Sequence, residues 1–413
     1  MLRDAEAAVE TTLRRSYGKL IAFLTARSGD VAGAEDALSD AFATALVAWR
    51  AQGIPENPEA WLLTAARRKH IDTVRRQGTT KAAAAPLALL AEERSAADEP
   101  SIPDNRLALM FVCAHPAIDP AVRTPLMLQT ILGFDGATIA SAFLTSPAAM
   151  SQRLVRAKAK IRGARIPFRV PEAPELGDRL PPVLNAIYAV FGAGWGDPAD
   201  AATDSRSLAA EGLWLARLLA ALLPEEPEVL GLLALVLFAE SRRTARRDTE
   251  GRYVPLADQD PTGWDTALID EAETHLLCAS RKGRVGRFQL EAAIQSAHAA
   301  RRRTERVDWP AIWQLYDHLV ALTGSPVAAI NRAVAVAEIR GPAEGLSALD
   351  AVAADPRVSG YQPYWAARAA LLGRAGDVAA AQAAYRHAIA LEIDPVVRSF
   401  LQQRSAGLTE TGL

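Results

Sequence analysis

Ser146–Arg169 reads SPAAMSQRLVRAKAKIRGARIPFR, a stretch with seven positive charges and no acidic residue. Ser146 is suited to cap a helix N-terminus, and Pro147 fits the first helical position, where its missing N–H has no partner to lose. An apolar stripe follows at helical spacing, made of Met150, Leu154, Ala157 and Ile161. The stretch therefore predicts a helix that docks through one side and presents cations on the other.

The residues before this helix supply a partner for it. Residues 135–143 read DGATIASAF and predict a short helix, and residues 144–146 form a tight connection. Two short helices, a brief turn and a basic second helix are typical of a helix-turn-helix, whose second helix enters the major groove of DNA. The alternative is an ordinary helix with a solvated basic face, which is what charge runs usually are. The cap, the turn and the docking stripe together favour DNA binding.

Composition indicates an almost wholly helical, all-α protein. The 413 residues are half hydrophobic and about a quarter charged, with few clusters of β-branched residues, and the chain is long enough for two or three domains. Residues 1–170 hold 22 Lys and Arg against 17 Asp and Glu, whereas the remainder holds 24 against 31. This asymmetry predicts nucleic-acid contacts in the first half only.

The cysteine count and the hydropathy pattern argue against a disulfide-stabilised protein and against membrane-spanning helices. The only cysteines, Cys113 and Cys278, cannot form a disulfide framework and suit a reducing cytoplasm. Cys113-Ala-His115 has no second Cys/His pair beside it, so neither a metal nor another cofactor is expected. Residues 213–223 and 229–239 are apolar but short and interrupted by Pro224 and Pro227, which predicts buried helices rather than membrane spans.

Residues 7–77 predict a first helical block. One amphipathic helix ends near Gly29, and a second runs over 31–50 with apolar residues at helical spacing and an acidic opposite face. After a loop with two prolines, a third helix from about Glu59 mixes Trp61 with a run of basic residues. Aromatic and basic residues together suit unpaired bases, because rings stack on bases while cations hold phosphates.

Four segments follow from this organisation. They are a helical block at 1–77, a linker rich in Ala and Pro at 78–104, a second helical block with the helix-turn-helix at 105–170, and a helical region at 175–413. In the last segment, residues 332–341 match residues 367–376 at an offset of 35, and a second helix and an Asp-Pro pair follow each copy. Tyr364, Ala369, Tyr385 and Ala388 fit this pattern, which is typical of tetratricopeptide repeats.

The first half resembles the extracytoplasmic-function class of sigma-70 family factors. The resemblance lies in residues 34–45 followed by Trp49, in residues 58–76, and in residues 138–158, which look like family regions 2.2, 2.3–2.4 and 4.2. The second half further resembles the subgroup that carries a tetratricopeptide-like C-terminal extension. The resemblance implies a promoter-specificity subunit without catalysis of its own, whose partners are core RNA polymerase (its β′ and β subunits) and promoter DNA.

The resemblance also implies roles for single residues. The helix at 31–50 would bind the clamp helices of the β′ subunit through Glu35, Asp36, Asp40 and Phe42. The residues that would capture and hold the −10 strand are Asn57, Trp61, Arg67, Arg68, His70, Arg75 and Arg76. The residues that would meet the −35 duplex are Gln152, Arg153, Arg156, Lys158 and Lys160. Ordinary structural roles are the alternatives for these residues. The acids of the helix at 31–50 would form a solvated face, Asn57 would lie in a proline turn, and Trp61 would belong to the core.

Two other function classes compete with this interpretation. A helix-turn-helix repressor or activator that senses a signal through the repeats explains the basic helix and the repeats, but not the acidic helix or the helix with Trp61. An enzyme would need a chemical site, for which Asp258, Asp260, Asp265, Asp270 and His275 are the candidates. No nucleophile motif or phosphate loop accompanies these residues, so catalysis is not expected. The repeat region is expected to be a regulator that contacts a protein partner or the rest of the chain.

Overall fold

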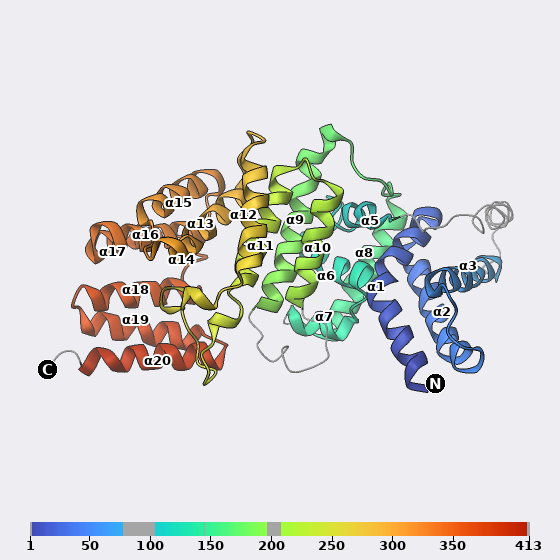
Figure 1. Cartoon of the computed structure of the whole chain (residues 1–413), viewed down its shortest axis with the longest axis horizontal. Helices are drawn as coiled ribbons and strands as arrows, with labels where there is room; N and C mark the ends of the chain where they lie inside the picture. Colours follow the sequence, from blue (N-terminus) through green and yellow to red (C-terminus); the bar gives the residue numbers. More distant parts are fainter. Residues whose placement is uncertain (1, 77–103, 144, 196–207, 411–413) are drawn as a thin grey trace. The chain divides into compact units, whose positions relative to one another are not determined.

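The structure is a computed structural model that describes residues 2–76, 104–143, 145–195 and 208–410. The described residues form helices without a strand, apart from an isolated antiparallel bridge between Arg247 and Tyr253, so the all-α prediction is confirmed. The chain divides into two compact units, Met1–Gly212 and Leu213–Leu413. Figure 1 shows the order of the helices in both. The predicted linker at 78–104 lies, except for Asp104, outside the described residues.

The first helical block consists of α1 (Leu2–Ser28), α2 (Val31–Gln52) and α3 (Pro58–Arg76). α1 buries Leu20 and Ile21 completely, and it ends before Gly29, whose φ of +66° few other residues tolerate. Most of the predicted apolar stripe of α2 is buried, namely Ala34, Leu38, Phe42, Ala45 and Trp49, while Leu46 of the same stripe is half-buried. α3 packs on both α1 and α2, so the acidic helix and the Trp-containing basic helix share one core.

The second helical block consists of α5 (Arg106–Cys113), α6 (Pro120–Leu132), α7 (Gly136–Ala142) and α8 (Pro147–Gly163), and α9 (Ala173–Trp195) follows it within the first unit. α8 starts as predicted: Pro147 is its first residue, and the Ser146 hydroxyl accepts a hydrogen bond from the backbone N–H of Ala149 at 3.3 Å. The predicted docking stripe of α8 is buried along its whole length, at Met150, Leu154, Ala157 and Ile161. α7 and α8 pack together as a helix-turn-helix requires.

The two blocks pack against each other within the first unit. α1 contacts α5 and α6, and α2 contacts α8. A close approach occurs at Gly18 in α1, where a Cβ atom would lie 2.2 Å from the carbonyl oxygen of Ile131 in α6. Because only glycine lets two backbones come so near, Gly18 fixes the distance between the blocks. Sequence patterns describe these blocks as separate modules and carry no sign of this packing.

The second unit is organised around α11 (Pro227–Ser241), which is buried on almost every side. α10 (Leu208–Leu222) precedes it and crosses the boundary between the units. α12 (Thr266–Ser280) and α13 (Arg287–Ala299) pack on α11, and the connection between α11 and α12 contains the short turns η3 (Thr244–Arg246), η4 (Leu256–Asp258) and η5 (Pro261–Gly263). No helix in the described ranges has the length and apolar character needed to cross a membrane.

Helix pairs follow to the end of the second unit. Their members are α14 (Arg301–Thr304), α15 (Trp309–Thr323), α16 (Pro326–Arg340), α17 (Pro342–Asp350), α18 (Gln362–Arg374), α19 (Val378–Leu391) and α20 (Pro395–Glu410). α15 packs on α16, α16 on α17, and α18 on α19. The repeat positions Tyr364, Ala369, Tyr385 and Ala388 are all buried at these contacts, as a helix-pair repeat predicts.

The contact at Gly18 yields a stability prediction. We expect Gly18→Ala to destabilise the protein by about 1–3 kcal/mol, because the added methyl group must push α1 away from α6. Gly163→Ala, in α8, is the matched control because nothing lies within 4 Å of its Cβ position. The control is expected to change stability by less than about 1 kcal/mol. Urea unfolding measures both, and equal effects of the two substitutions would contradict the close packing.

Candidate nucleic-acid interface

The outer face of α8 carries the cations of the predicted recognition helix. Gln152, Arg153, Arg156 and Lys160 are exposed, and the guanidinium of Arg156 donates a hydrogen bond to the Gln152 side-chain oxygen at 3.3 Å. No acidic residue occurs on α8. This exposed face combines cations with a side-chain amide, the groups that meet phosphates and base edges in protein–DNA contacts.

Lys158 has a different environment from its neighbours on α8. Its side chain is 10% exposed and forms an ion pair with Glu35 of α2, which is 12% exposed. Burial raises the pKa of Glu35, although the charge of Lys158 acts in the opposite direction. The second carboxylate oxygen of Glu35 is buried without a hydrogen-bond partner. A residue predicted to bind polymerase and a residue predicted to bind DNA thus neutralise each other inside the first unit.

A second ion pair extends the contact between α2 and α8. Arg162 of α8 lies 3.1 Å from a carboxylate oxygen of Asp30, the residue that precedes α2. The Arg162 side chain is 64% exposed, so this pair contributes little to stability by itself. Like the pair of Glu35 and Lys158, it joins α8 to the α2 side of the contact between these two helices. Neither Asp30 nor the pairing of Glu35 is indicated by any local sequence pattern, because the partners are more than a hundred residues apart.

The remaining residues predicted to bind polymerase are placed unequally on α2. Asp36 and Asp40 are exposed, and a carboxylate oxygen of Asp40 lies 3.4 Å from the ammonium nitrogen of Lys69. Phe42 is 6% exposed and belongs to the core. Of the residues predicted to bind polymerase, Asp36 and Asp40 therefore lie at the surface of α2, while Phe42 supports the helix from within.

The start of α3 carries two of the residues predicted to meet an unpaired base, Asn57 and Trp61. The Asn57 side chain is exposed, and its oxygen accepts a hydrogen bond from the backbone N–H of Ala60 at 3.1 Å. Trp61 is half-buried, with its ring edge-on to Trp49 at 5.7 Å between centroids. Asn57 thus caps α3 and Trp61 packs on α2, which are local structural duties for both residues.

The basic residues of α3 differ in exposure. Arg68 is exposed, His70 is half-buried, and the guanidinium of Arg67 lies 4.9 Å from the ring centroid of Phe23 in α1. The side chains of Arg75 and Arg76 lie outside the described residues. α3 is also tied to α1 through Glu59, which accepts hydrogen bonds from Ser16 and from Lys19. Sequence reasoning missed this link, since Ser16 and Lys19 belong to no motif.

The acidic residues considered for a chemical site have structural partners. Asp260 and Asp265 accept hydrogen bonds from backbone N–H groups at the starts of η5 and α12, and Asp258 pairs with Arg404. Within the described ranges no group of three potential ligands is close enough to hold a metal ion. Cys113 is buried beside the hydroxyl of Thr130 in α6, and burial raises the pKa of its thiol to about 12. This thiol is therefore a packing group.

Comparison with known proteins supplies the context for this geometry. Residues 12–80 match sigma-70 region 2, a range that begins within α1 and includes α2 and α3. Residues 179–280 match a family of unknown function that spans the junction of the two units. An uncharacterised protein of Rhizobium meliloti (strain 1021) is 38% identical over 378 residues, covering 90% of this chain and 89% of that protein. No solved structure matches the chain.

The Glu35–Lys158 pair can be tested by removing its members in turn. Lys158→Met leaves a buried carboxylate without its partner, which we expect to cost about 3–5 kcal/mol of unfolding free energy at pH 7. The double variant with Glu35→Gln should recover most of this loss, because no buried charge then remains. Lys160→Met on the exposed face is the matched control and should change stability by less than about 0.5 kcal/mol.

The pH dependence of Lys158→Met follows from the raised pKa of Glu35. A carboxyl group that takes up a proton more readily when folded destabilises the folded state above that pKa and ceases to do so as the pH falls through it. The loss caused by Lys158→Met should therefore be smaller at pH 5 than at pH 7. Chemical unfolding at both pH values measures it, and equal losses for Lys158→Met and Lys160→Met would refute the buried pair.

Proposed function

We propose that this chain is an RNA polymerase sigma factor of the sigma-70 family, that it is of the extracytoplasmic-function class, and that it carries a fused C-terminal regulatory domain. The observation that carries the proposal is the first unit, which joins the region 2 helices to a capped helix-turn-helix with an exposed basic face. A sigma factor of this class needs those two parts: one to melt and hold the −10 element, and one to read the −35 element as duplex.

For the −35 element, we assign base contacts to Gln152, Arg153 and Arg156, and phosphate contacts to Lys160. These side chains are exposed on one rigid helix, and Arg side chains make bidentate contacts with guanine in the major groove. Lys158 would join the phosphate contacts only after α8 separates from α2, because its ammonium group is held by Glu35.

For the −10 element, the proposed site is the start and the basic face of α3. Asn57 and the loop before it would capture an extruded base, with Trp61 beside it as an aromatic wall. The cations of α3 proposed to hold the strand and its phosphates are Arg67, Arg68, His70, Arg75 and Arg76. Support for this role comes from the exposure of Arg68 and from the match of residues 12–80 to sigma-70 region 2.

The polymerase-binding surface is proposed to lie on α2, with Asp36 and Asp40 in direct contact. Glu35 would contact polymerase only if its pair with Lys158 opens, and Phe42 would support the surface from the core. The closed packing of the two blocks is then the resting form of the free chain. Core polymerase would compete with Lys158 for the acidic face of α2 and release α8 for DNA.

The second unit is proposed to be a tetratricopeptide-like regulator. Its support is the run of packed helix pairs from α15 to α20, with small residues and tyrosines buried at the repeat positions. Such stacks present a continuous surface to a protein partner or to another part of the same chain. We propose that this surface decides when the first unit acts.

A helix-turn-helix regulator with a sensor domain is the alternative. It explains α7, α8 and the helix pairs, but it assigns no purpose to the exposed acids of α2 or to the region 2 match. Binding to core polymerase separates the two functions, because a repressor or activator of this kind does not require it.

In vitro transcription tests the proposal. The full chain is mixed with core polymerase and genomic DNA of its source, and transcript starts are mapped. We expect the chain to bind core polymerase and to select starts that share elements near −35 and −10. Arg153→Ala with Arg156→Ala should reduce these transcripts at least tenfold, since each base contact contributes about 1–3 kcal/mol, while binding to core polymerase persists.

Further chains in the same transcription assay serve as a control and test the role of the second unit. Arg284→Ala with Arg303→Ala removes two charges from the second unit and should leave the transcripts unchanged. A chain that ends at Gly212 lacks the second unit. If its transcripts and their regulation are the same as those of the full chain, the second unit has no regulatory role. A full chain that binds DNA but not core polymerase would favour the alternative regulator.

A further inference from the structure

The connection between α11 and α12, residues 242–265, is the longest between two consecutive α-helices in the described part of the second unit. By contrast, Gly341 alone separates α16 from α17, and residues 324–325 separate α15 from α16. Connections longer than about 15 residues are usually either functional or disordered. This connection is held by hydrogen bonds along its length, so its length points to a function.

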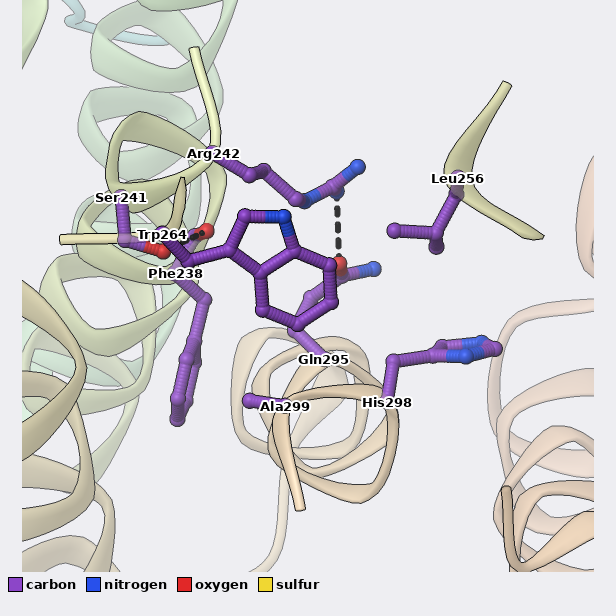
Figure 2. Close-up of a pocket in the computed structure, with 8 residues that line it drawn as sticks. All are labelled: Phe238, Ser241, Arg242, Leu256, Trp264, Gln295, His298 and Ala299. Carbon is purple, nitrogen blue, oxygen red and sulfur yellow. Dashed lines mark hydrogen bonds between the residues drawn. The ribbon is translucent and has the colours of Figure 1, made fainter. Parts of the chain in front are cut away.

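The last part of the connection, residues 256–265, is anchored in the second unit. Trp264 is 5% exposed and lines a cavity together with Gln295 and His298 of α13 (Figure 2). The cavity has a volume of about 10 Å³, which is room for one water molecule. Arg301 donates hydrogen bonds to three backbone oxygens of this part. The last part of the connection is therefore fixed beside α13.

The first part of the connection, residues 244–254, turns back on itself. The backbone N–H of Val254 donates to the oxygen of Arg246 at 2.8 Å, and the N–H of Asp248 donates to the oxygen of Arg252 at 3.0 Å. Figure 1 shows the connection, drawn in yellow, beside α20 at the other end of the second unit. The connection thus joins the first helices of this unit to the last one.

Three side-chain contacts join the connection to α20. They are Arg247 with Asp394 at 3.4 Å, Tyr253 with Phe400 at 5.4 Å between ring centroids, and Asp258 with Arg404 at 2.8 Å. Along the connection the order of these groups is base, aromatic ring, acid, whereas along α20 it is acid, aromatic ring, base. The connection therefore complements α20 in charge and in order, as a bound peptide complements its docking surface.

The contacts between the connection and α20 are weak enough to exchange. The side chains of Asp258 and Arg404 are 50% and 54% exposed, and exposed ion pairs contribute little to stability. Tyr253 and Phe400 are only half-buried. Another protein segment with the same order of groups can therefore replace the connection on α20 at little cost in free energy.

Apolar side chains beside these contacts give such a segment more to bind. Ile393, directly before Asp394, is 79% exposed, and Leu391 is 38% exposed. Covering exposed apolar area is favourable. A segment that carries an apolar residue ahead of its base would bury this area, which the connection leaves in contact with water.

We propose that the α20 surface made of Asp394, Phe400 and Arg404 docks a protein segment with the order apolar, basic, aromatic, acidic, and that the connection occupies this surface in the free chain as an internal ligand. The anchored part keeps the connection close to α20, so that it returns when the segment leaves. As a route of control this rests on the regulatory role proposed for the second unit, whereas docking itself does not require promoter recognition by the first unit.

A peptide added to the full chain tests the proposal. The probe is a synthetic peptide of residues 244–260 with a fluorine label at its N-terminus, because broadening of the fluorine resonance detects even millimolar binding. A full chain with Arg247→Glu and Tyr253→Ala, whose own connection is weakened on α20, is compared with the parent chain. We expect the peptide to bind this open variant at least about tenfold more tightly, because in the parent chain the tethered connection competes at a high effective concentration.

A charge reversal locates the docking surface. In the open variant, Arg404→Glu should weaken binding of the peptide roughly threefold, and a peptide with Asp258→Arg should restore it. Arg340→Glu reverses an exposed charge on α16 and is the matched control, which should leave binding unchanged. Circular dichroism verifies that every variant is folded.

Three results would overturn the docking surface: no binding of the peptide to the open variant, equal binding to the open variant and the parent chain, or equal effects of Arg404→Glu and Arg340→Glu. Binding of the same chains to core polymerase is measured separately. Its loss would contradict the proposed sigma-factor function and leave the docking surface intact, so the two failures are distinguishable.

Discussion

The ion pair between Glu35 and Lys158 is the interaction on which the arrangement of the first unit depends. It joins the acidic helix α2 to the basic helix α8 across a buried contact, and a buried charge is tolerated only while its partner stays in place. The backbone approach of Gly18 to Ile131 brings α1 and α6 together beside it. The two blocks therefore have one well-defined packing, and any partner that needs Glu35 or Lys158 must first separate α2 from α8.

Much of the fold could be predicted from local patterns in the sequence. The cap at Ser146 and the stripe from Met150 to Ile161 predict α8 and its buried side correctly, because both depend only on helical periodicity and on the first helical turn. The role of Lys158 could not be predicted in the same way. It is one of several cations on α8, and its difference from Lys160 arises from a carboxylate that the fold brings from α2. Long-range pairs of this kind leave no periodic signal.

The second unit shows the same division between local and long-range information. Buried Tyr364 and Tyr385 follow from the repeat spacing, and the all-round burial of α11 follows from its uninterrupted apolar sequence. The acids near Asp260 suggest chemistry by their number alone, but the structure gives them helix starts and an ion pair as partners. The residues around Trp264 come from three segments, so their meeting could not be read from any single stretch of sequence.

On the proposed function, the free chain holds α2 and α8 together and core polymerase separates them. Electron spin resonance between labels at Val47 and Val155 measures this directly, since both side chains are exposed, at 71% and 65%. Exposed Cys278 is first replaced by serine, and buried Cys113 is left in place. We expect one narrow distance distribution for the free chain and a shift to longer distances on addition of core polymerase. A broad distribution in the free chain, or no shift when polymerase binds, would contradict it.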